Sequence, residues 1–302
     1  MINRSKIKYT LKKILPKTLF VVVLGLWQKI FIKLVDTIDA VRLKSFTTYR
    51  PVDVSHHGHA FSLFISPQNG FIDKHIYLYG VYEPFILDLI AQHLKKGDVF
   101  VDIGANIGQH TMFAASVVGT EGKVSSFEPI PRVYNQLLDS ARINHFEDII
   151  DARNIALGEA PKTETLYVET NNVGGSSIVG PHGKENEEIV INIKRGDDEL
   201  KDFQRVDMIK MDVEGYEYEV LAGIQKVLAI HKPVIVMEFS GKLYFEKGRD
   251  HGNKIISLLQ NLGYNLYDVE NYMKQVVSKE DFLSEFSNNK KAQCDLLCLP
   301  QK

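Results

Sequence analysis

The first residues with the pattern of a binding site form the turn Asp102-Ile-Gly-Ala-Asn-Ile-Gly108, which follows an apolar segment. Gly104 and Gly108 permit a tight turn and a close approach of the backbone to a ligand. Asn106 tolerates left-handed backbone angles and offers an amide group. Glu128 ends the next apolar segment, 24 residues beyond Gly104, where an acidic side chain can accept hydrogen bonds from a ribose diol. The spacing therefore predicts a site for a nucleoside.

The turn differs from the dinucleotide-binding fingerprint in its spacing and its charge. That fingerprint reads G-x-G-x-x-G and presents a helix N-terminus to pyrophosphate, whereas this chain has G-x-N-x-G led by Asp102. A carboxylate repels pyrophosphate but suits a ligand that carries an amino group and a cationic centre. S-adenosylmethionine has an ammonium, a sulfonium and a ribose diol, so we expect it as the cofactor.

Two other functions remain as alternatives and make different predictions. A nicotinamide-dependent oxidoreductase predicts a pyrophosphate-binding glycine turn and a Tyr-x-x-x-Lys pair after the fourth strand, where this chain has Asp212-Val-Glu-Gly215. A non-catalytic Rossmann-like binding protein predicts damage to the cofactor turn, whereas each of its positions is filled here. The pattern favours a transferase over both.

The elements that must position these residues alternate between strand and helix from residue 98 onward. Strands are expected at 98–103, 123–127, 149–156, 165–168, 189–193, 206–211, 233–237, 264–267 and 295–299. Helices are expected at 111–118, 132–144, 218–228 and 252–262. This alternation predicts a mostly parallel sheet covered on both faces. Ligands bind such sheets beyond the carboxyl ends of the strands, which is where the turn and Glu128 fall.

Residues 46–97 are expected to form lead-in elements ahead of this sheet. Aromatic and β-branched residues predict strands at 61–65 and 76–79, with a turn at Asn69-Gly70. Apolar residues at helical spacing predict a helix at 84–94.

Residue types that ligate transition metals are few. Cys294 and Cys298 are the two cysteines, which excludes a disulfide scaffold and a four-cysteine zinc site. The cluster His56-His57-Gly-His59 falls in a predicted loop, with no carboxylate partner expected nearby. We therefore expect a solvated loop there rather than a metal site.

Four motifs in sequence order resemble those of the FkbM family of S-adenosylmethionine-dependent methyltransferases. They are Asp102–Gly108, Phe127-Glu-Pro129, Ile209-Lys-Met-Asp-Val-Glu-Gly215 and Pro233-Val-Ile-Val-Met-Glu238. Gly80-Val-Tyr-Glu83 and Gly174-Gly-Ser176 resemble two further stretches of that family, and the resemblance covers roughly residues 76–240. It implies an α/β fold with a class I methyltransferase sheet of seven strands, the last of them antiparallel. It also implies O-methylation of a hydroxyl on a sugar, a glycan or a related metabolite.

The resemblance assigns residues to the cofactor. Gly104, Asn106 and Gly108 would line its methionine end, Asp102 would bond its ammonium or order the turn, and Glu128 would take the ribose. The full set implied by the resemblance is Glu83, Asp102, Gly104, Ala105, Asn106, Gly108, Glu128, Pro129, Asp151 and Asp212.

Three acids at strand ends are the expected catalytic residues: Asp212, Glu214 and Glu238. Methyl transfer is an in-line displacement, and holding the reactants in line can supply up to roughly 7–11 kcal/mol. A hydroxyl acceptor must also lose a proton, so Asp212 is the first candidate for the base or for orienting the acceptor. The three carboxylates would suit a hard divalent cation, although none is expected. Glu214 could instead cap the helix that begins near Gly215.

The glycine-rich loop 171–177 and the following His182 have two interpretations. The loop could fold over the acceptor as a lid, and the family's corresponding loop borders the active site. It could also be a connector only, since polar glycine-rich loops commonly are.

The N-terminal 45 residues form the first of three expected segments, followed by 46–97 and 98–302. The first fifty residues hold eleven Lys or Arg against two Asp or Glu, whereas the remainder holds 25 against 36. The apolar run 19–27 is nine residues long, short of the roughly 20 that a spanning helix needs. A basic amphipathic helix lying on a membrane surface is expected, with packing on this chain or on a second subunit as the alternative.

The composition is that of an ordinary globular chain. Its 302 residues are 44% hydrophobic and 25% charged, with a net charge of −2. No aromatic-basic nucleic-acid motif appears, so we expect a small-molecule or glycan acceptor and no nucleic acid. We expect a cytoplasmic protein that the N-terminal segment could hold at the inner membrane face. The sequence leaves the oligomeric state open.

Overall fold

The computed structural model describes residues 37–169, 172–180, 186–246, 250–288 and 290–301. Residues 48–302 form one compact unit, and the segment that ends at Thr47 forms another. In the latter, residues 37–43 are helical. The expected membrane-surface helix lies almost entirely outside the described residues and stays a prediction. Among the described helices, none combines the length and the apolar composition that a membrane crossing requires.

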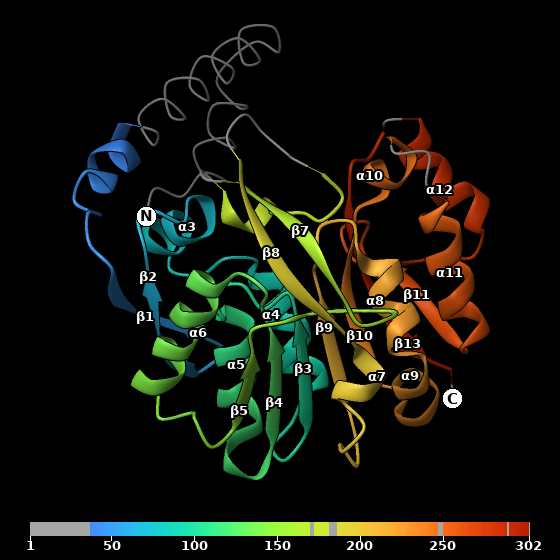
Figure 1. The fold of residues 1–302 in the computed structure, drawn as a ribbon, viewed down its shortest axis with the longest axis horizontal. Helices are drawn as coiled ribbons and strands as arrows, with labels where there is room; N and C mark the ends of the chain where they lie inside the picture. Colours follow the sequence, from blue (N-terminus) through green and yellow to red (C-terminus); the bar gives the residue numbers. More distant parts are fainter. Residues whose placement is uncertain (1–36, 170–171, 181–185, 247–249, 289, 302) are drawn as a thin grey trace, which may run out of the picture. The chain divides into compact units, whose positions relative to one another are not determined.

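An eight-stranded sheet is the centre of the 48–302 unit (Figure 1). In spatial order its strands are β12 (Lys274–Gln275), β11 (Tyr264–Asp268), β13 (Cys294–Pro300), β10 (Val234–Phe239), β9 (Met208–Met211), β3 (Val99–Ile103), β4 (Lys123–Phe127) and β5 (Ile150–Arg153). The strands from β10 to β5 pair in parallel, whereas β13 runs antiparallel to both of its neighbours. The expected mostly parallel sheet with an antiparallel last strand is confirmed.

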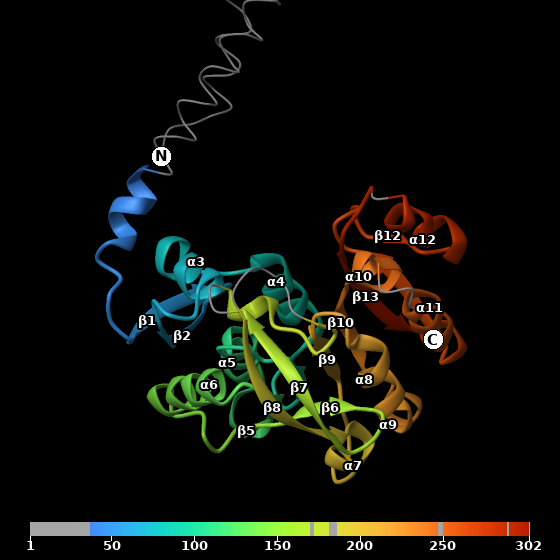
Figure 2. The same cartoon turned by 45° about the horizontal axis from the view of Figure 1, so that its top comes forward.

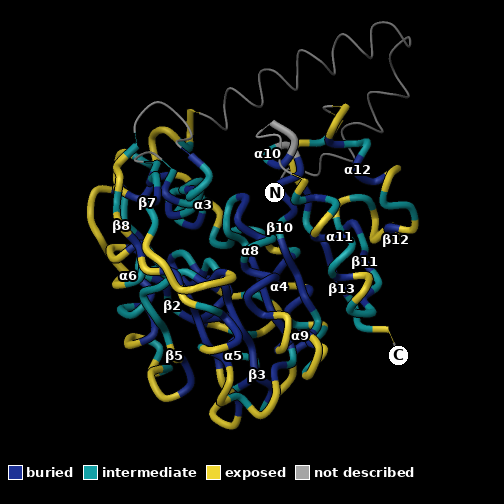
Figure 3. The backbone as a smooth tube through the Cα atoms, turned by 45° about the vertical axis from the view of Figure 1, so that its right-hand side comes forward, coloured by how far each residue is buried: buried dark blue, intermediate teal, exposed yellow. Residues whose placement is uncertain are grey.

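The two central strands, β3 and β9, are buried at every residue, because helices cover both faces of a parallel sheet. Figure 3 shows the backbone of β3 as buried along its length. Their apolar side chains, such as Phe100 and Ile209, are fully inaccessible to solvent. This rigid centre fixes the loops that follow each strand.

Helices lie on both faces of the sheet (Figure 1). From β3 the chain moves toward one edge of the sheet through α5 (Gln109–Val118) and α6 (Pro131–Ile143). From β9 it moves toward the other edge through α8 (Glu217–Gly223), α9 (Gln225–His231) and α11 (His251–Asn261). Because crossovers between parallel strands are right-handed, the two helix sets cover opposite faces. The helix expected at 84–94 is α4 (Pro84–His93), and it packs on α5.

A second sheet of three strands accompanies the main one, in the order β6 (Ala156–Gly158), β8 (Asn186–Arg195), β7 (Lys162–Glu169). The expected single strand 149–156 is wrong, because the chain divides there between β5 of the main sheet and β6 of this one. Figure 2 shows β7 and β8 as a separate pair beside the main sheet. The short helix η2 (Val173–Gly175) follows β7 and contacts the neighbourhood of Asn69, whose carbonyl accepts from the Val173 amide at 3.2 Å.

The expected helix 218–228 is two helices, α8 and α9. Asp197, in the short helix α7 (Gly196–Glu199), accepts hydrogen bonds from the amides of Lys226 and Val227 at 3.0 and 3.2 Å. These amides are in the first turn of α9, where backbone donors lack partners inside the helix. A cap supplied from elsewhere in the chain cannot be seen in the local periodicity, so the break was not predicted.

The lead-in begins with a hairpin of β1 (Arg50–His56) and β2 (His59–Ile65), which packs against α5 and α6. The expected strand 76–79 is wrong: those residues end the helix α3 (Phe71–Tyr79). Asp73 in the first turn of α3 is buried and accepts from the Ser66 amide at 2.6 Å and from Gln136 at 2.8 Å. These tertiary contacts override the strand preference of the aromatic residues.

The histidine cluster also differs from expectation. His56 ends β1 and His57 forms part of the hairpin turn, and each has its Nε2 within hydrogen-bond distance of Asp88 Oδ1, at 2.6 and 2.7 Å. The expected absence of a carboxylate partner was wrong, because Asp88 lies 31 residues further along the chain, on α4.

Three further helices were not predicted. They are η1 (Gly119–Glu121), α10 (Gly241–Glu246) and α12 (Lys279–Ser287). Helices α10 and α12 pack together beyond the end of β10, which places α10 beside the carboxyl ends of the strands.

Candidate active site

The site lies where the strand order reverses, between β3 and β9. The loop after β3 leads toward β4 and the loop after β9 leads toward β10, so the two diverge and leave a crevice at the carboxyl end of the sheet. The Asp212 amide still donates to the Ile103 carbonyl at 3.0 Å, which holds the two loops together at their start. Two connected cavities open from this point.

Gly104 is the closest approach between the two loops. Its φ is +75°, and a Cβ placed there would lie 1.8 Å from the carbonyl oxygen of Asp212. No side chain fits in that space. Asn106 adopts the left-handed conformation expected for it, with φ of +50°, and its own side-chain oxygen accepts from the Ile107 amide at 2.8 Å.

Glu128 is buried directly beneath this turn. One carboxylate oxygen accepts from the Asn106 amide at 2.9 Å and the other accepts from the Ile130 amide at 2.8 Å. Burial raises the pKa of Glu128 to about 7, although these two hydrogen bonds act to lower it. The backbone bonds occupy one lone pair on each oxygen, so further acceptor capacity remains for a hydroxyl ligand.

A narrow, largely apolar slot of about 70 Å³ extends from Glu128. Aliphatic and aromatic side chains form its walls, which is the lining that a flat ring prefers. They include Phe127, Ile130, Leu157 and Val173.

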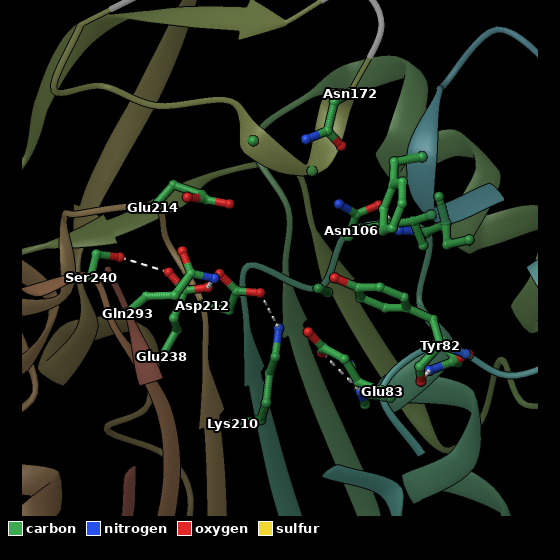
Figure 4. Close-up of a pocket in the computed structure, with 18 of the residues that line it drawn as sticks. Tyr82, Glu83, Asn106, Asn172, Lys210, Asp212, Glu214, Glu238, Ser240 and Gln293 are labelled. Atoms are coloured by element: carbon green, nitrogen blue, oxygen red, sulfur yellow. Dashed lines mark hydrogen bonds and ion pairs between the residues drawn. The ribbon is translucent and has the colours of Figure 1, made fainter. Parts of the chain in front are cut away.

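A wider cavity of about 480 Å³ adjoins the slot, and Asn106, Gly174, Asp212 and Glu214 line both. Its lining is strongly polar. In Figure 4 the acids Asp212, Glu214 and Glu238 lie on one side, and Tyr82, Glu83 and Asn106 lie on the other. The complete polar lining is Tyr82, Glu83, Asn106, Gln109, His110, Glu169, Asn172, Lys210, Asp212, Glu214, Glu238, Ser240 and Gln293.

Lys210 on β9 reaches up between the two loops. Its ammonium donates to the Gly104 carbonyl at 3.0 Å and lies 3.6 Å from Asp212 and 3.9 Å from Asp102. Burial acts to lower the pKa of Lys210, but Asp212, Asp102 and the other nearby carboxylates raise it above its usual value. A charged lysine therefore partly balances the acids around it.

The oxygen atoms of Asp212, Glu214 and Glu238 approach within 4.8 Å of one another. Burial, followed by the charge of Asp212, raises the pKa of Glu214 to about 9 and raises that of Glu238 well above its usual range. Glu214 is accordingly protonated at neutral pH. Glu238 accepts from Ser240 Oγ at 2.7 Å, and Asp212 Oδ1 is buried without a hydrogen-bond partner among the described residues.

The loop that carries Glu214 is held by a buried acid that the sequence did not single out. Glu217 accepts from the Gly215 amide at 3.0 Å and from the Tyr244 hydroxyl at 2.6 Å. Ser177 fixes the other side, since its hydroxyl donates to the Glu214 carbonyl at 2.7 Å. Helix α8 has Tyr216 as its N-cap and no side-chain cap, so Glu214 does not cap it, and the Glu214 side chain lines the cavities.

Three residues expected at the cofactor do not line either cavity. Asp102 is fully buried beneath the turn, where it accepts from Thr111 Oγ1 at 2.6 Å. Gly108 starts α5 against Leu137. Asp151 is at the protein surface, paired with Arg153 at 2.6 Å. The other seven residues of the expected set line at least one cavity: Glu83, Gly104, Ala105, Asn106, Glu128, Pro129 and Asp212.

The structure adds residues that local sequence reasoning missed. His110 lines the wide cavity from α5; its Nε2 is buried without a hydrogen-bond partner among the described residues and lies 4.0 Å from Glu83. Lys210 is a charged residue in an otherwise apolar strand, a departure from the strand pattern that could have identified it. Of the glycine-rich loop, Asn172 and Ser176 border the cavities, whereas His182 lies outside the described residues.

Comparison with known proteins identifies the family. The family model described as the methyltransferase FkbM domain matches residues 102–266. Methyltransferase sdnD of Sordaria araneosa is 26% identical over 164 residues, which cover 44% of this chain and 63% of that protein. Hexuronic acid methyltransferase AglP of Haloferax volcanii is 27% identical over 161 residues, covering 53% of this chain and 63% of that protein. The chain thus spans less than two thirds of the length of either relative.

Among solved structures, a methyltransferase FkbM from Methylobacillus flagellatus matches with a TM-score of 0.41 and 14% identity, over 74% of this chain and 54% of that one. The family model accounts for more than half of the residues, including the turn after β3, the acid that ends β4 and the acidic loop after β9. The chain therefore belongs to the FkbM methyltransferase family.

Proposed function

We propose that the protein is an O-methyltransferase that uses S-adenosylmethionine. The observation that carries the proposal is Glu128, a buried acid with spare acceptor capacity in the wall of an apolar slot that adjoins a cavity lined by carboxylates. The slot would take the adenine ring and Glu128 the ribose diol. The ammonium and sulfonium of the methionine end would then face Asp212 and Glu83 rather than an anion-binding surface.

The residues present fit this cofactor better than a dinucleotide. Asp212 Oδ1 is a buried acceptor without a partner among the described residues, at the place where the two cavities meet. A cationic ligand satisfies such an oxygen, whereas the charge of Asp212 would repel a pyrophosphate.

Bound S-adenosylmethionine would supply an electrophilic methyl group, whose bond to sulfur breaks as its bond to the acceptor oxygen forms. Asp212 is the base that takes the proton of the acceptor hydroxyl, because it pairs with Lys210 and carries the negative charge of the acidic trio. Glu214, protonated at neutral pH, donates a hydrogen bond that orients the acceptor. Glu217 and Ser177 position this loop without contacting the reactants.

The charge of the wide cavity indicates the class of acceptor. Among the described residues that line it, the one ammonium is that of Lys210, which is already shared by Gly104, Asp102 and Asp212. Burial, followed by Asp212, also raises the pKa of Glu83 to about 7, so negative charge is already crowded here. We infer a neutral or amino-bearing polyol, in contrast to the hexuronic acid named for the relative AglP.

Turnover on simple probe sugars tests this acceptor class. Methyl glucoside and methyl glucosaminide should be methylated at least about tenfold more efficiently than methyl glucuronide, a difference of about 1.4 kcal/mol. Glu169→Gln removes one carboxylate from the lining of the cavity. It should reduce the difference in methylation efficiency between these two sugars and methyl glucuronide. Equal or preferential methylation of the glucuronide by the unaltered chain would contradict the inference.

The affinity for S-adenosylhomocysteine should depend on pH through Glu128. Only the carboxylate form can accept both ribose hydroxyl groups, and its pKa is about 7. The dissociation constant should therefore fall as pH rises from 6 to 7.5 and level off above that. Glu128→Gln should weaken binding roughly 10- to 100-fold, because hydrogen bonds to charged groups contribute about 1.5–3 kcal/mol, and should flatten the pH profile.

Asp151→Asn is the matched control, since Asp151 is an acid near the end of the neighbouring strand but outside both cavities. Its titration curves should superimpose on those of the unaltered protein. If Glu128→Gln binds as tightly as the unaltered chain across the same pH range, the ribose assignment is wrong.

A further inference from the structure

A second group of metal-ligating side chains lies outside the candidate active site, between the β1–β2 hairpin and α4. Its members are His56, His57 and Asp88, and their donor atoms all lie within 4.8 Å of one another. Both imidazole Nε2 atoms approach the same carboxylate oxygen, at 2.6 and 2.7 Å. None of the three lines either cavity of the active site.

The convergence of two consecutive histidines follows from the turn. Neighbouring residues in a strand point to opposite faces, but His57 has φ of +47° and is followed by Gly58 with φ of +80°. Two central residues with positive φ make the tight hairpin turn that joins antiparallel strands, and His56 pairs with His59 across it. The left-handed His57 breaks the alternation, so both rings reach Asp88.

The neighbouring side chains hold this arrangement in place. The ring of His56 packs against the edge of Phe113, with centroids 5.9 Å apart, and lies 4.4 Å from the ring of His57. The side chain of His56 is 19% exposed, whereas those of His57 and Asp88 are 57% and 54% exposed. One ligand is therefore fixed by the core, and the open side leaves room for water to complete a coordination sphere.

We propose that His56, His57 and Asp88 bind one divalent transition-metal ion of the zinc type. Two imidazole nitrogens and one carboxylate oxygen form a donor set that such ions prefer, whereas Mg²⁺ prefers oxygen alone. On binding, each Nε2 presents its lone pair to the ion and its proton is carried by Nδ1 or released to solvent. The ion would join the hairpin to α4, the helix that begins directly after Glu83 of the active site.

Isothermal titration of the full, untagged chain with zinc chloride tests the site. We expect one ion per chain with a dissociation constant below about 10 µM, weaker binding at pH 5.5 than at pH 7.5, and no heat of binding with magnesium chloride at the same concentration. Zinc in hundredfold excess over its dissociation constant should also raise the melting temperature by roughly 5 °C.

His57 and Asp88 are the two exposed members of the proposed site, so variants at these positions should fold normally. His57→Ala and Asp88→Asn should each weaken zinc binding at least about tenfold and remove the rise in melting temperature. His145→Ala is the matched control, because His145 is also exposed and also has positive φ, +57°, and it should bind zinc like the unaltered chain. The proposal is overturned if the unaltered chain binds no zinc, or if zinc binding survives both His57→Ala and Asp88→Asn.

Discussion

Replacing Gly104 with alanine should destabilise the protein by roughly 2–5 kcal/mol and weaken S-adenosylhomocysteine binding more than tenfold. A left-handed conformation costs a non-glycine residue about 1–2 kcal/mol, and inserting an atom into a packed site costs about 1–3 kcal/mol more. At Gly104 the added Cβ would lie 1.8 Å from the carbonyl oxygen of Asp212, so the loop after β9 must move. That movement carries Asp212 and Glu214 away from the cofactor.

Gly80→Ala is the control that separates the cost of backbone strain from the cost of a steric clash. Gly80 has φ of +88°, but a Cβ there meets no atom within 4 Å. It should cost only about 1 kcal/mol, with cofactor affinity unchanged. Urea unfolding of the unaltered chain and of the two variants measures their free energies of unfolding. The comparison requires that the free energy depend on urea concentration with a similar slope in all three proteins. A Gly104→Ala protein within 0.5 kcal/mol of Gly80→Ala would show that the two loops do not pack as closely as the structure has them.

Asp212→Asn should reduce the turnover number by roughly 10²–10⁴-fold, which is the usual contribution of a general base. Asparagine keeps the size of the side chain and its ability to bond, but it cannot take the hydroxyl proton. Binding of S-adenosylhomocysteine should weaken far less than turnover falls, because Glu128 and the apolar slot are untouched and only the contact of residue 212 with the ammonium loses its charge. Transfer of radiolabelled methyl groups to the probe glycosides, together with calorimetry, measures the two quantities separately.

Glu214→Gln is the control for this experiment. Since the pKa of Glu214 is about 9, its carboxyl group already carries a proton at pH 7, and glutamine mimics that neutral state. Turnover should fall by less than about tenfold. The roles of the two acids would be reversed if Glu214→Gln were inactive and Asp212→Asn remained active.

The main sheet could be predicted because its signals are local. Buried parallel strands such as β3 and β4 are short apolar runs that end in turns, and α6 and α11 show one apolar face. The predicted elements are wrong where contacts with residues far away in the sequence determine the local structure. Asp197 caps α9 from 29 residues away, and Asp73 anchors α3 through Gln136, which is 63 residues away.

The residues of the candidate site also divide into those that local sequence patterns predict and those that they do not. Gly104, Asn106 and Glu128 were predicted to lie together, and they line the cavities, because their positions depend on spacing along one strand–turn–helix unit. Asp102 was expected to bond the ammonium of the ligand or to order the turn, and it is buried beneath the turn, where its burial raises its pKa and Lys210 lowers it. Lys210 stands out locally as the charged residue of an apolar strand. His110 and Glu217 become meaningful only through their neighbours in space, and nothing within a local window indicates those neighbours.

Titration of the full chain with S-adenosylhomocysteine and, in parallel, with NAD tests the central claim most directly. Carboxylates around the crevice between β3 and β9 predict saturable one-to-one binding of the sulfur nucleoside and no heat of binding with the diphosphate. A folded protein that bound NAD, or that left S-adenosylhomocysteine unbound at millimolar concentration, would contradict the account.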